Sequence, residues 1–154
     1  MNQVGMHWED FAVGDVFESS ARTIAEADIV NFAGVSGDFN PLHTDEEYAR
    51  SLGFESRLAH GTLVLSVATG LIARMGLLEG TAIAFLELTW RFVGPVLSGD
   101  TVKVHLRVTE LRPTKRDDRA VMIRDVDVVN QRGDVVQNGS QTLLIKRRPT
   151  DDST

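Results

Sequence analysis

The sequence predicts an α+β domain in which an antiparallel sheet curls around one long, apolar helix. Two observations predict this class. Hydrophobic residues recur with a helical period in the N-terminal half, whereas apolar and polar residues alternate after Gly80. The chain has 154 residues, a length that suits a single core. We therefore expect one domain over 1–148 and a frayed polar tail over 149–154.

The composition excludes several classes of protein. The 16 Lys and Arg residues against 22 Asp and Glu residues give a net charge of -6, which argues against nucleic acid as a partner. No cysteine is present, so disulfides, thiolate catalysis and Cys-ligated metal centres are excluded. The N-terminus lacks a signal-peptide core, and the most apolar stretch, Leu63–Ala73, is too short to span a bilayer. We expect a cytoplasmic protein that does not contact a membrane and uses no metal or other cofactor.

The N-terminal half contains two helix-start patterns. Thr23–Glu26 and Thr44–Glu47 each match a capping box, in which the threonine caps the helix and the glutamate reaches back. The first helix is expected to end near Gly34 or Gly37. Between the two helices, Ser36–His43 is interrupted by a glycine and a proline, which predicts a structured loop.

A longer helix is predicted over Gly61–Met75. Its apolar residues recur at helical spacing at Val64, Val67, Ala68, Leu71, Ile72 and Met75. Because Leu63 and Leu65 are apolar as well, we expect other structure to enclose most of its circumference. At 1.5 Å per residue the helix would be roughly 22 Å long, enough to cross a small sheet.

The C-terminal half predicts four long strands. They are expected over 86–92, 102–108, 120–129 and 135–146, half-buried and antiparallel, with a short earlier strand over Val16–Arg22. Gln131–Asp134 predicts a hairpin turn, and Asn138–Gly139 predicts a bulge. Such strands after a long apolar helix favour a sheet that curls around it. The open sheet edges would favour dimerisation.

The residues that could carry chemistry lie in Asp38–His43 and in Ala59–Thr62. A carboxylate and an imidazole five residues apart on a constrained loop can converge on one water molecule. The Gly61 N–H, at the positive end of a helix, can polarise a carbonyl group. A turn is the commoner role of an isolated Asp-x-Asn-Pro segment. The addition of His43 and the His-Gly pair favours a site for hydration of an unsaturated carbonyl compound, or for thioester hydrolysis.

Three segments carry a family resemblance. Ser36–Ala49 and Leu58–Gly61 resemble the hydratase 2 motif of the MaoC-like, (R)-specific enoyl-CoA hydratases, and the likeness continues through Phe92–Asp100. The resemblance implies a hot-dog fold and a homodimer with active sites at the subunit interface. It also implies reversible syn addition of water to a trans-2-enoyl thioester, carried by coenzyme A or acyl carrier protein.

The same resemblance assigns roles to residues. Asp38 and His43 match the catalytic pair, Asn40 matches a supporting position and Gly61 matches the backbone donor to the thioester carbonyl. Asp38 would deprotonate a water held between it and His43. The resulting hydroxide would attack the β-carbon, and a proton would reach the α-carbon on the same face.

Four further residues are expected to contact the substrate: Phe39, His60, Thr62 and Thr69. Two of them, His60 and Thr69, also have a structural interpretation. His60 would then cap the long helix or orient the loop, and Thr69 would be a small packing residue.

Other functions stay open. A hot-dog thioesterase usually carries its carboxylate on the long helix, but residues 61–75 contain no Asp or Glu. A non-catalytic acyl-thioester binding module would need neither Asp38 nor His43. The assembly could also be a hetero-oligomer or a larger complex. The acyl group could be branched or dicarboxylic, with Arg57 or Arg91 as the partner of a distal carboxylate.

Overall fold

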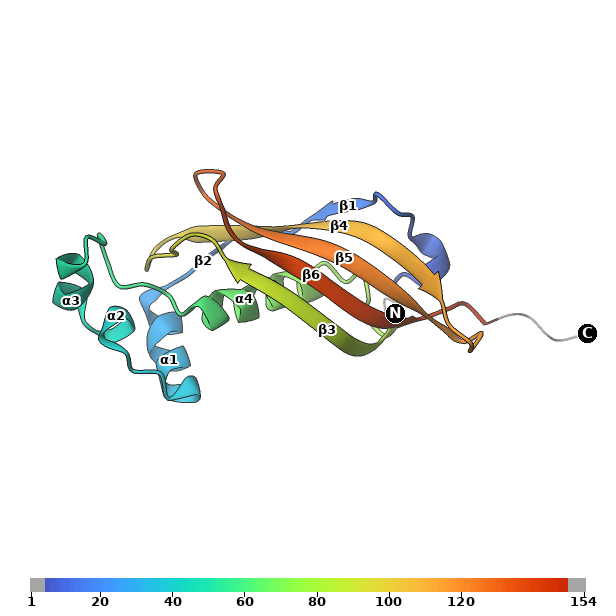
Figure 1. Cartoon of the computed structure of the whole chain (residues 1–154), viewed down its shortest axis with the longest axis horizontal. Helices are drawn as coiled ribbons and strands as arrows, with labels where there is room; N and C mark the ends of the chain where they lie inside the picture. Colours follow the sequence, from blue (N-terminus) through green and yellow to red (C-terminus); the bar gives the residue numbers. More distant parts are fainter. Residues whose placement is uncertain (1–4, 150–154) are drawn as a thin grey trace, which may run out of the picture.

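The computed structural model describes residues 5–149 and is built around an antiparallel sheet. The strands follow the order β1–β4–β5–β6–β3, and β2 also pairs with β4. They are β1 (Val16–Glu18), β2 (Arg22–Thr23), β3 (Ala82–Phe92), β4 (Thr101–Pro113), β5 (Arg119–Asn130) and β6 (Val135–Lys146). Figure 1 shows them as a curved layer with helix α4 (Gly61–Arg74) along its hollow side. The predicted α+β class and the curled sheet are confirmed.

Helix α4 buries one face and exposes the other. Its buried residues are Leu63, Val64, Val67, Ala68, Leu71 and Ile72. They pack in one cluster with sheet residues such as Val104 and Val126. Thr62 and Thr69 on the opposite face are exposed. The expectation that the helix is enclosed around most of its circumference is therefore wrong for a single chain, although its predicted extent is correct to one residue.

Shorter helices gather beside the start of α4 at one end of the sheet (Figure 1). They are α1 (Glu26–Ser36), α2 (Pro41–Thr44) and α3 (Glu46–Ser51), and a 3-10 turn, η1 (Trp8–Asp10), precedes β1. Residues 5–149 contain no helix that is long and apolar enough to cross a membrane. The predicted tail over 149–154 lies outside the described residues, apart from Pro149.

The two predicted capping boxes are wrong in detail. Thr23 belongs to β2, and α1 is capped at Ala25, whose N–H donates to Asp28 Oδ2 over 2.8 Å. Thr44 is the last residue of α2, and Asp45 caps α3 by accepting a hydrogen bond from the third residue of that helix over 3.0 Å. In α3 the Asp45 carboxylate takes the role predicted for the threonine, and in α1 the Asp28 carboxylate takes the role predicted for the glutamate that reaches back. Each charge also interacts favourably with the positive end of its helix.

The predicted strand over Val16–Arg22 is split into β1 and β2. The Ser19 hydroxyl, which lies between them, accepts a hydrogen bond from Val104 N–H over 2.9 Å. This side-chain oxygen takes the place of a backbone carbonyl in the ladder. The strand pairing is therefore interrupted at this point.

The bulge predicted at Asn138–Gly139 is also wrong. Gly139 pairs regularly with Trp90 on β3, and the shift in register on β6 occurs just after Val135. A Cβ atom at Gly139 would lie 2.0 Å from the Thr89 carbonyl oxygen. The glycine therefore permits a close approach between β3 and β6.

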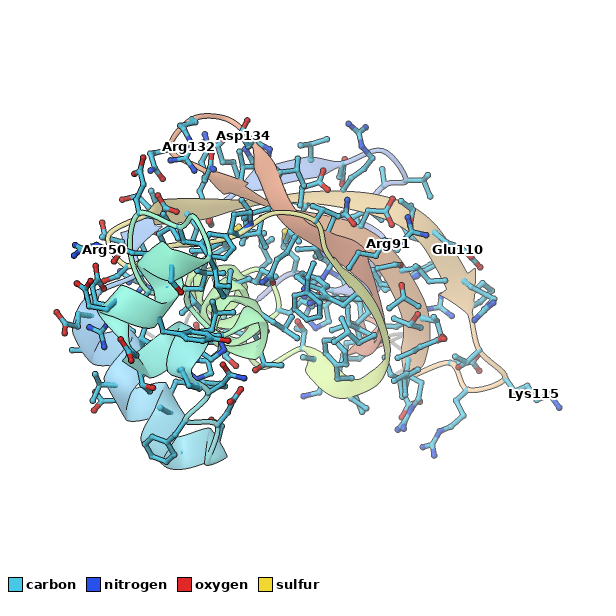
Figure 2. All side chains as sticks on the ribbon, turned by 60° about the vertical axis from the view of Figure 1, so that its left-hand side comes forward. Arg50, Arg91, Glu110, Lys115, Arg132 and Asp134 are labelled. Atoms are coloured by element: carbon cyan, nitrogen blue, oxygen red, sulfur yellow. The ribbon has the colours of Figure 1, made fainter. Side chains whose placement is uncertain are left out.

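The hairpin turn predicted at Gln131–Asp134 is confirmed, since it connects β5 to β6. Arg132 and Asp134 form an ion pair of 3.4 Å there. Figure 2 shows these two side chains at one end of the sheet and Lys115, in the turn between β4 and β5, at the other. The long strands thus extend from one end of the sheet to the other.

Strand β3 differs most from its predicted burial. Burial alternates along β4, as expected. On β3, however, Phe85, Leu86 and Leu88 are 51%, 52% and 39% exposed. Within residues 5–149, β3 pairs with β6 on one side and with no strand on the other. The expectation of a half-buried strand is therefore wrong for β3 in a single chain, because this strand is a sheet edge.

Candidate active site

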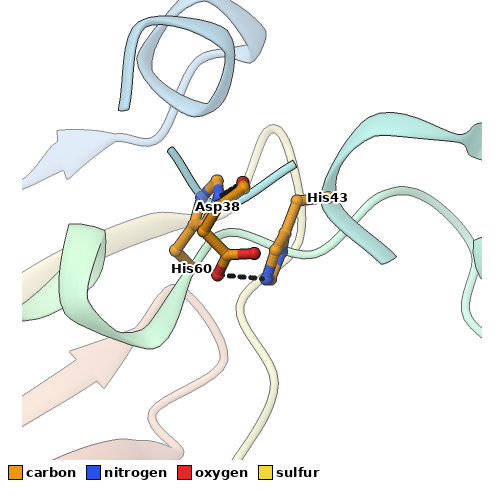
Figure 3. A group of neighbouring side chains, drawn as sticks. All are labelled: Asp38, His43 and His60. Carbon is orange, nitrogen blue, oxygen red and sulfur yellow. Dashed lines mark hydrogen bonds and ion pairs between the residues drawn. The ribbon is translucent and has the colours of Figure 1, made fainter. Parts of the chain in front are cut away.

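The candidate site forms where the loop after α1 meets the start of α4 (Figure 3). Gly37 ends α1 with a φ of 75°, and Asp38 follows directly. Asn40 caps α2: its side-chain oxygen accepts a hydrogen bond from the backbone of the second residue of that helix over 3.0 Å. The segment predicted as a loop therefore contains a short helix, because Pro41 suits the first helical position. This helix carries His43.

His43 offers one ring nitrogen to the site. Its Nδ1 lies 2.8 Å from the Leu58 carbonyl oxygen, and this oxygen can only accept, so Nδ1 carries a proton. In the neutral ring Nε2 is then an acceptor, and it lies 3.8 Å from Asp38 Oδ2. The side chain of His43 is 13% exposed and that of Asp38 is 53% exposed. A substrate can therefore reach the carboxylate while the protein holds the imidazole.

His60 contacts both Asp38 and His43. Its Nε2 donates to the backbone carbonyl of Asp38 over 2.9 Å. Its ring stacks on that of His43, with centroids 3.8 Å apart and an interplanar angle of 26°. The buried Nδ1 has no hydrogen-bond partner among the described residues. These contacts orient the loop that carries Asp38. The His60 side chain makes no capping hydrogen bond to α4.

The first turn of α4 is held by Gln137, a residue that no sequence pattern predicts to lie at the site. Its Nε2 donates to the Gly61 carbonyl over 2.9 Å, and its Oε1 accepts from Trp90 Nε1 over 2.9 Å. The Gly61 N–H has no backbone acceptor within residues 5–149. A Cβ atom at Gly61 would lie 2.7 Å from the Phe92 ring. A side chain at position 61 would therefore require Phe92 or the helix start to shift, and the glycine leaves its N–H as a free donor.

One cavity of about 450 Å³ brings most of the predicted site residues together. It is lined by Asp38, His43, His60, Gly61 and Thr62. Three predicted residues lie elsewhere. Asn40 caps α2, Phe39 is 62% exposed outside this cavity, and Thr69 lines a second cavity further along α4. The catalytic and substrate-binding roles of all eight residues stay predictions.

Asp38, His43 and His60 are also close enough to be considered as metal ligands. Their donor atoms lie within 4.8 Å of one another. Carbonyl oxygens already engage one nitrogen of each imidazole, which leaves His43 Nε2 and His60 Nδ1. A ring nitrogen binds a metal in the plane of its ring, and stacked rings with an interplanar angle of 26° are poorly placed to direct both nitrogens at one ion. The arrangement suits acid–base chemistry better than a shared ion.

The separation of the carboxylate and the imidazole suits a bridging water. The 3.8 Å between Asp38 Oδ2 and His43 Nε2 is too long for a direct hydrogen bond. A water between them would donate one hydrogen to each acceptor and turn its oxygen lone pairs toward the cavity. Beside it, the Gly61 N–H can stabilise negative charge on a substrate oxygen. The site can therefore activate water next to a polarised carbonyl group.

A sheet wrapped around one long helix defines a hot-dog protein, and in this one a carboxylate–imidazole pair lies beside the start of that helix. A double hot-dog protein of Mycobacterium tuberculosis has the same fold, with a TM-score of 0.86 at 20% identity over 97% of this chain and 47% of its own. A MaoC like domain model matches residues 10–131. The chain belongs to this MaoC-like family of hydratases and dehydratases, as its motifs suggest.

Two relatives are similar over nearly their whole length. The (R)-specific enoyl-CoA hydratase of Rhodospirillum rubrum is 35% identical over 142 residues, which is 92% of this chain and 93% of the relative. The unliganded R-hydratase of Pseudomonas aeruginosa superposes with a TM-score of 0.78 at 35% identity, over 94% of this chain and 88% of its own. The predicted family and hot-dog fold are thereby confirmed.

Proposed function

We propose that this protein is a hydro-lyase that reversibly adds water to trans-2-enoyl thioesters to give (R)-3-hydroxyacyl thioesters. The observation that carries the proposal is the pair of acceptors, Asp38 Oδ2 and His43 Nε2, held 3.8 Å apart beside the free N–H of Gly61. The name and the near-complete coverage of the R. rubrum relative support the same reaction and stereochemistry.

Asp38 takes the proton of the attacking water. As the water oxygen bonds to the β-carbon, its proton passes to Asp38, while the electron pair of the C=C bond moves toward the thioester carbonyl. The proton is then delivered to the α-carbon on the same face, which completes syn addition and restores the carboxylate. His43 orients the water through Nε2, because its other nitrogen already donates to Leu58.

The Gly61 N–H stabilises the negative charge that develops on the thioester oxygen. It lies at the positive end of α4, so the helix dipole adds to the hydrogen bond. Removing one donor of this kind typically lowers the rate by roughly 10²–10³-fold. Asn40 acts indirectly, since it caps the short helix that carries His43.

The proposed assembly is a homodimer formed through β3, with the site at the subunit interface. The free edge and the exposed apolar residues of β3 support this arrangement. The substrate carrier is coenzyme A or acyl carrier protein, and a hetero-oligomeric or larger assembly is the alternative. A cytoplasmic location and a reaction without metal or cofactor remain part of the proposal.

The second candidate function is a hot-dog thioesterase, in which the Gly61 N–H would likewise donate to the thioester carbonyl. Two observations favour hydration: α4 carries no Asp or Glu, and the available carboxylate faces an imidazole acceptor across a gap that suits water. A non-catalytic binding module is the third candidate. It would bind acyl thioesters without needing either acceptor.

A hydration assay with free-thiol detection separates these functions. Purified protein is mixed with trans-2-enoyl-CoAs of several chain lengths, and loss of the enoyl absorbance, product chirality and free thiol are followed together. We expect (R)-3-hydroxyacyl-CoA without thiol release. Thiol release would identify a thioesterase, and the (S) product would contradict the proposed geometry. If no enoyl-CoA and no enoyl-acyl carrier protein reacts while both bind, the protein is a binding module.

A further inference from the structure

A second cavity of about 560 Å³ lies beside the C-terminal half of α4, between this helix and the β6–β3 side of the sheet. Most of its lining is apolar, including Ile72, Leu77, Phe85 and Leu143. It also contains Arg124, a cation that neither the fold nor the proposed reaction explains. The second cavity and its arginine therefore have no role yet in the fold or in the proposed reaction.

The second cavity lies on the same helix and sheet faces as the candidate site. Thr62 lines the site and Thr69 lines the second cavity, seven residues further along one face of α4. On β6, Gln137 lines the site, and Gln141 lines the second cavity on the same face of the strand. The separation from Thr62 to Thr69 along α4 is about 10 Å, and that from Gln137 to Gln141 along β6 is about 13 Å, so the two elements give similar distances from the site to the second cavity. An acyl chain bound at Gly61 can therefore lead toward the second cavity.

Arg124 is buried on the face of β5 that contacts α4. Its neighbours on this face of the strand, Met122 and Val126, are buried and apolar, and Arg124 itself is 6% exposed. Within residues 5–149 the Arg124 guanidinium has no carboxylate partner, and its one hydrogen bond goes to Gln141, although Glu79 also lines the cavity. Burial lowers the pKa of Arg124 to about 10, so it stays charged at neutral pH. A buried charge without a counter-ion is costly for a protein to keep.

The hydrogen bond made by Arg124 leaves further donors available. Its Nε donates to Gln141 Oε1 over 3.0 Å, which fixes the orientation of the glutamine amide and leaves Gln141 Nε2 free. The terminal guanidinium nitrogens make no hydrogen bond to the described residues, and they are not among the fully enclosed polar atoms. They therefore open on to the cavity. A planar set of donors in an apolar cavity matches the two oxygens of a carboxylate.

Arg74 also lines the second cavity, but it is exposed, so solvent screens its charge and an ion pair with it contributes little. Two other arginines are less suited to this task. Arg57 is already paired with Glu26 and Glu46. Arg91 lines a polar hollow that it shares with Arg107, on the face of the sheet turned away from α4. Neither of these side chains lines the second cavity.

We propose that Arg124 and Gln141 bind a carboxylate at the far end of the substrate's acyl chain, so that the preferred substrates are ω-carboxy-trans-2-enoyl thioesters of medium length. This inference rests on the proposed function and specifies its substrate class. The distal carboxylate supplies the counter-ion that Arg124 lacks, and the apolar walls contact the methylene groups between the two ends. A methyl-terminated acyl chain would leave the guanidinium unpaired against hydrocarbon, at a cost in affinity.

The test compares substrates that differ at one end only. Hydration of trans-2-octenoyl-, trans-2-decenoyl- and trans-2-dodecenoyl-CoA is measured against their ω-carboxy counterparts of equal length. We expect a higher kcat/KM for at least one ω-carboxy substrate. Arg124→Met should lower the ratio of ω-carboxy to methyl-terminated kcat/KM by about a hundredfold, on the scale of removing one partner of a buried charge pair. Arg124→Lys, which keeps the charge without the planar donors, should give an intermediate ratio.

A control variant and a binding measurement complete the test. Arg107→Met removes an exposed arginine from the other face of the sheet and should leave the ratio unchanged. Calorimetric binding of saturated ω-carboxyacyl-CoA to wild type and Arg124→Met reports on the carboxylate without turnover. Hydration with an unchanged ratio in Arg124→Met would overturn the inference and leave the proposed function intact. Binding that depends on Arg124 without any hydration would overturn the proposed function and support the carboxylate site.

Discussion

At the scale of single residues, the two imidazoles of the site have different roles. His43 turns an acceptor nitrogen toward Asp38, while His60 donates to the backbone of Asp38 and supports the His43 ring by stacking. Both protonation patterns follow from backbone carbonyls, which can only accept. The acceptor pair is therefore built into the fold before any substrate binds.

Replacing Gly61 with alanine should impair catalysis by displacing the start of α4. The new Cβ atom would lie 2.7 Å from Phe92, so either the ring or the helix must move, and the N–H moves with the helix. We expect kcat/KM for enoyl-thioester hydration to fall by about 10²-fold. The measurement is steady-state kinetics of Gly61→Ala, with Phe92→Ala added as a second change that should restore part of the rate.

Gly70→Ala is the matched control, because this exposed glycine lies in the same helix and a Cβ atom added to it would meet nothing within 4 Å. It should keep its activity and raise the free energy of unfolding by about 0.5–1 kcal/mol. Equal activities of Gly61→Ala and Gly70→Ala would contradict the prediction that the added Cβ atom displaces the start of α4.

The residues predicted from the sequence are those that lie close together in the chain. Asp38 and His43 share one loop, and the Gly61 N–H follows from a helix start. Gln137 lies 76 positions from Gly61 and Arg124 reaches a cavity across the sheet, so their roles depend on strand register, which the sequence does not reveal. One feature of the sequence could have indicated Gln137 and Arg124: each is a polar residue at a position of its strand that faces the core.

At the scale of elements, Gln137 connects the sheet to the start of α4. Gln137→Leu would leave the Gly61 carbonyl and Trp90 Nε1 without their partner. Each unpaired buried group costs about 1–3 kcal/mol, so chemical denaturation should show a clear loss of stability. Because the Gly61 peptide also shifts, kcat should fall more than KM rises.

Asn138→Leu provides the comparison for this substitution, since it changes the adjacent residue on the opposite face of the same strand. Its side chain makes no hydrogen bond within residues 5–149. If Gln137→Leu were as stable and as active as Asn138→Leu, the link between β6 and α4 would have no energetic role.

The elements themselves were predicted unevenly, for physical reasons. The period of α4 and the alternation along β4 and β5 persist because each buries one face against the other. The caps lie one or two residues after the predicted threonines, because the Asp28 and Asp45 carboxylates accept from backbone donors there. Helix α2 has only four residues, Pro41–Thr44, too few for a hydrophobic period to reveal.

At the scale of the whole molecule, the free edge of β3 should pair with a second copy of the chain. Leu86 on this edge is 52% exposed, and a lysine there would place a charge in the interface. We expect wild type to elute at twice the mass of one chain in size-exclusion chromatography with light scattering. Leu86→Lys should shift the protein toward monomer and lower the hydration rate.

Val135→Lys serves as the control, because Val135 is 40% exposed at the start of β6, away from that edge. It should remain dimeric and active. A wild-type monomer with full activity, or a Leu86→Lys variant that stays dimeric, would place the interface elsewhere or show that the site needs no partner.

The most direct measurement compares the hydration kcat of wild type, Asp38→Asn and Asp117→Asn. The carboxylate of Asp38 is the proposed base, so Asp38→Asn should lower kcat by about 10²–10⁴-fold. Its thermal midpoint should stay close to that of wild type, because the side chain is 53% exposed. Asp117→Asn, an exposed residue in the β4–β5 turn, should behave as wild type. Undiminished turnover of a folded Asp38→Asn would contradict the assignment of this carboxylate as the base that activates water.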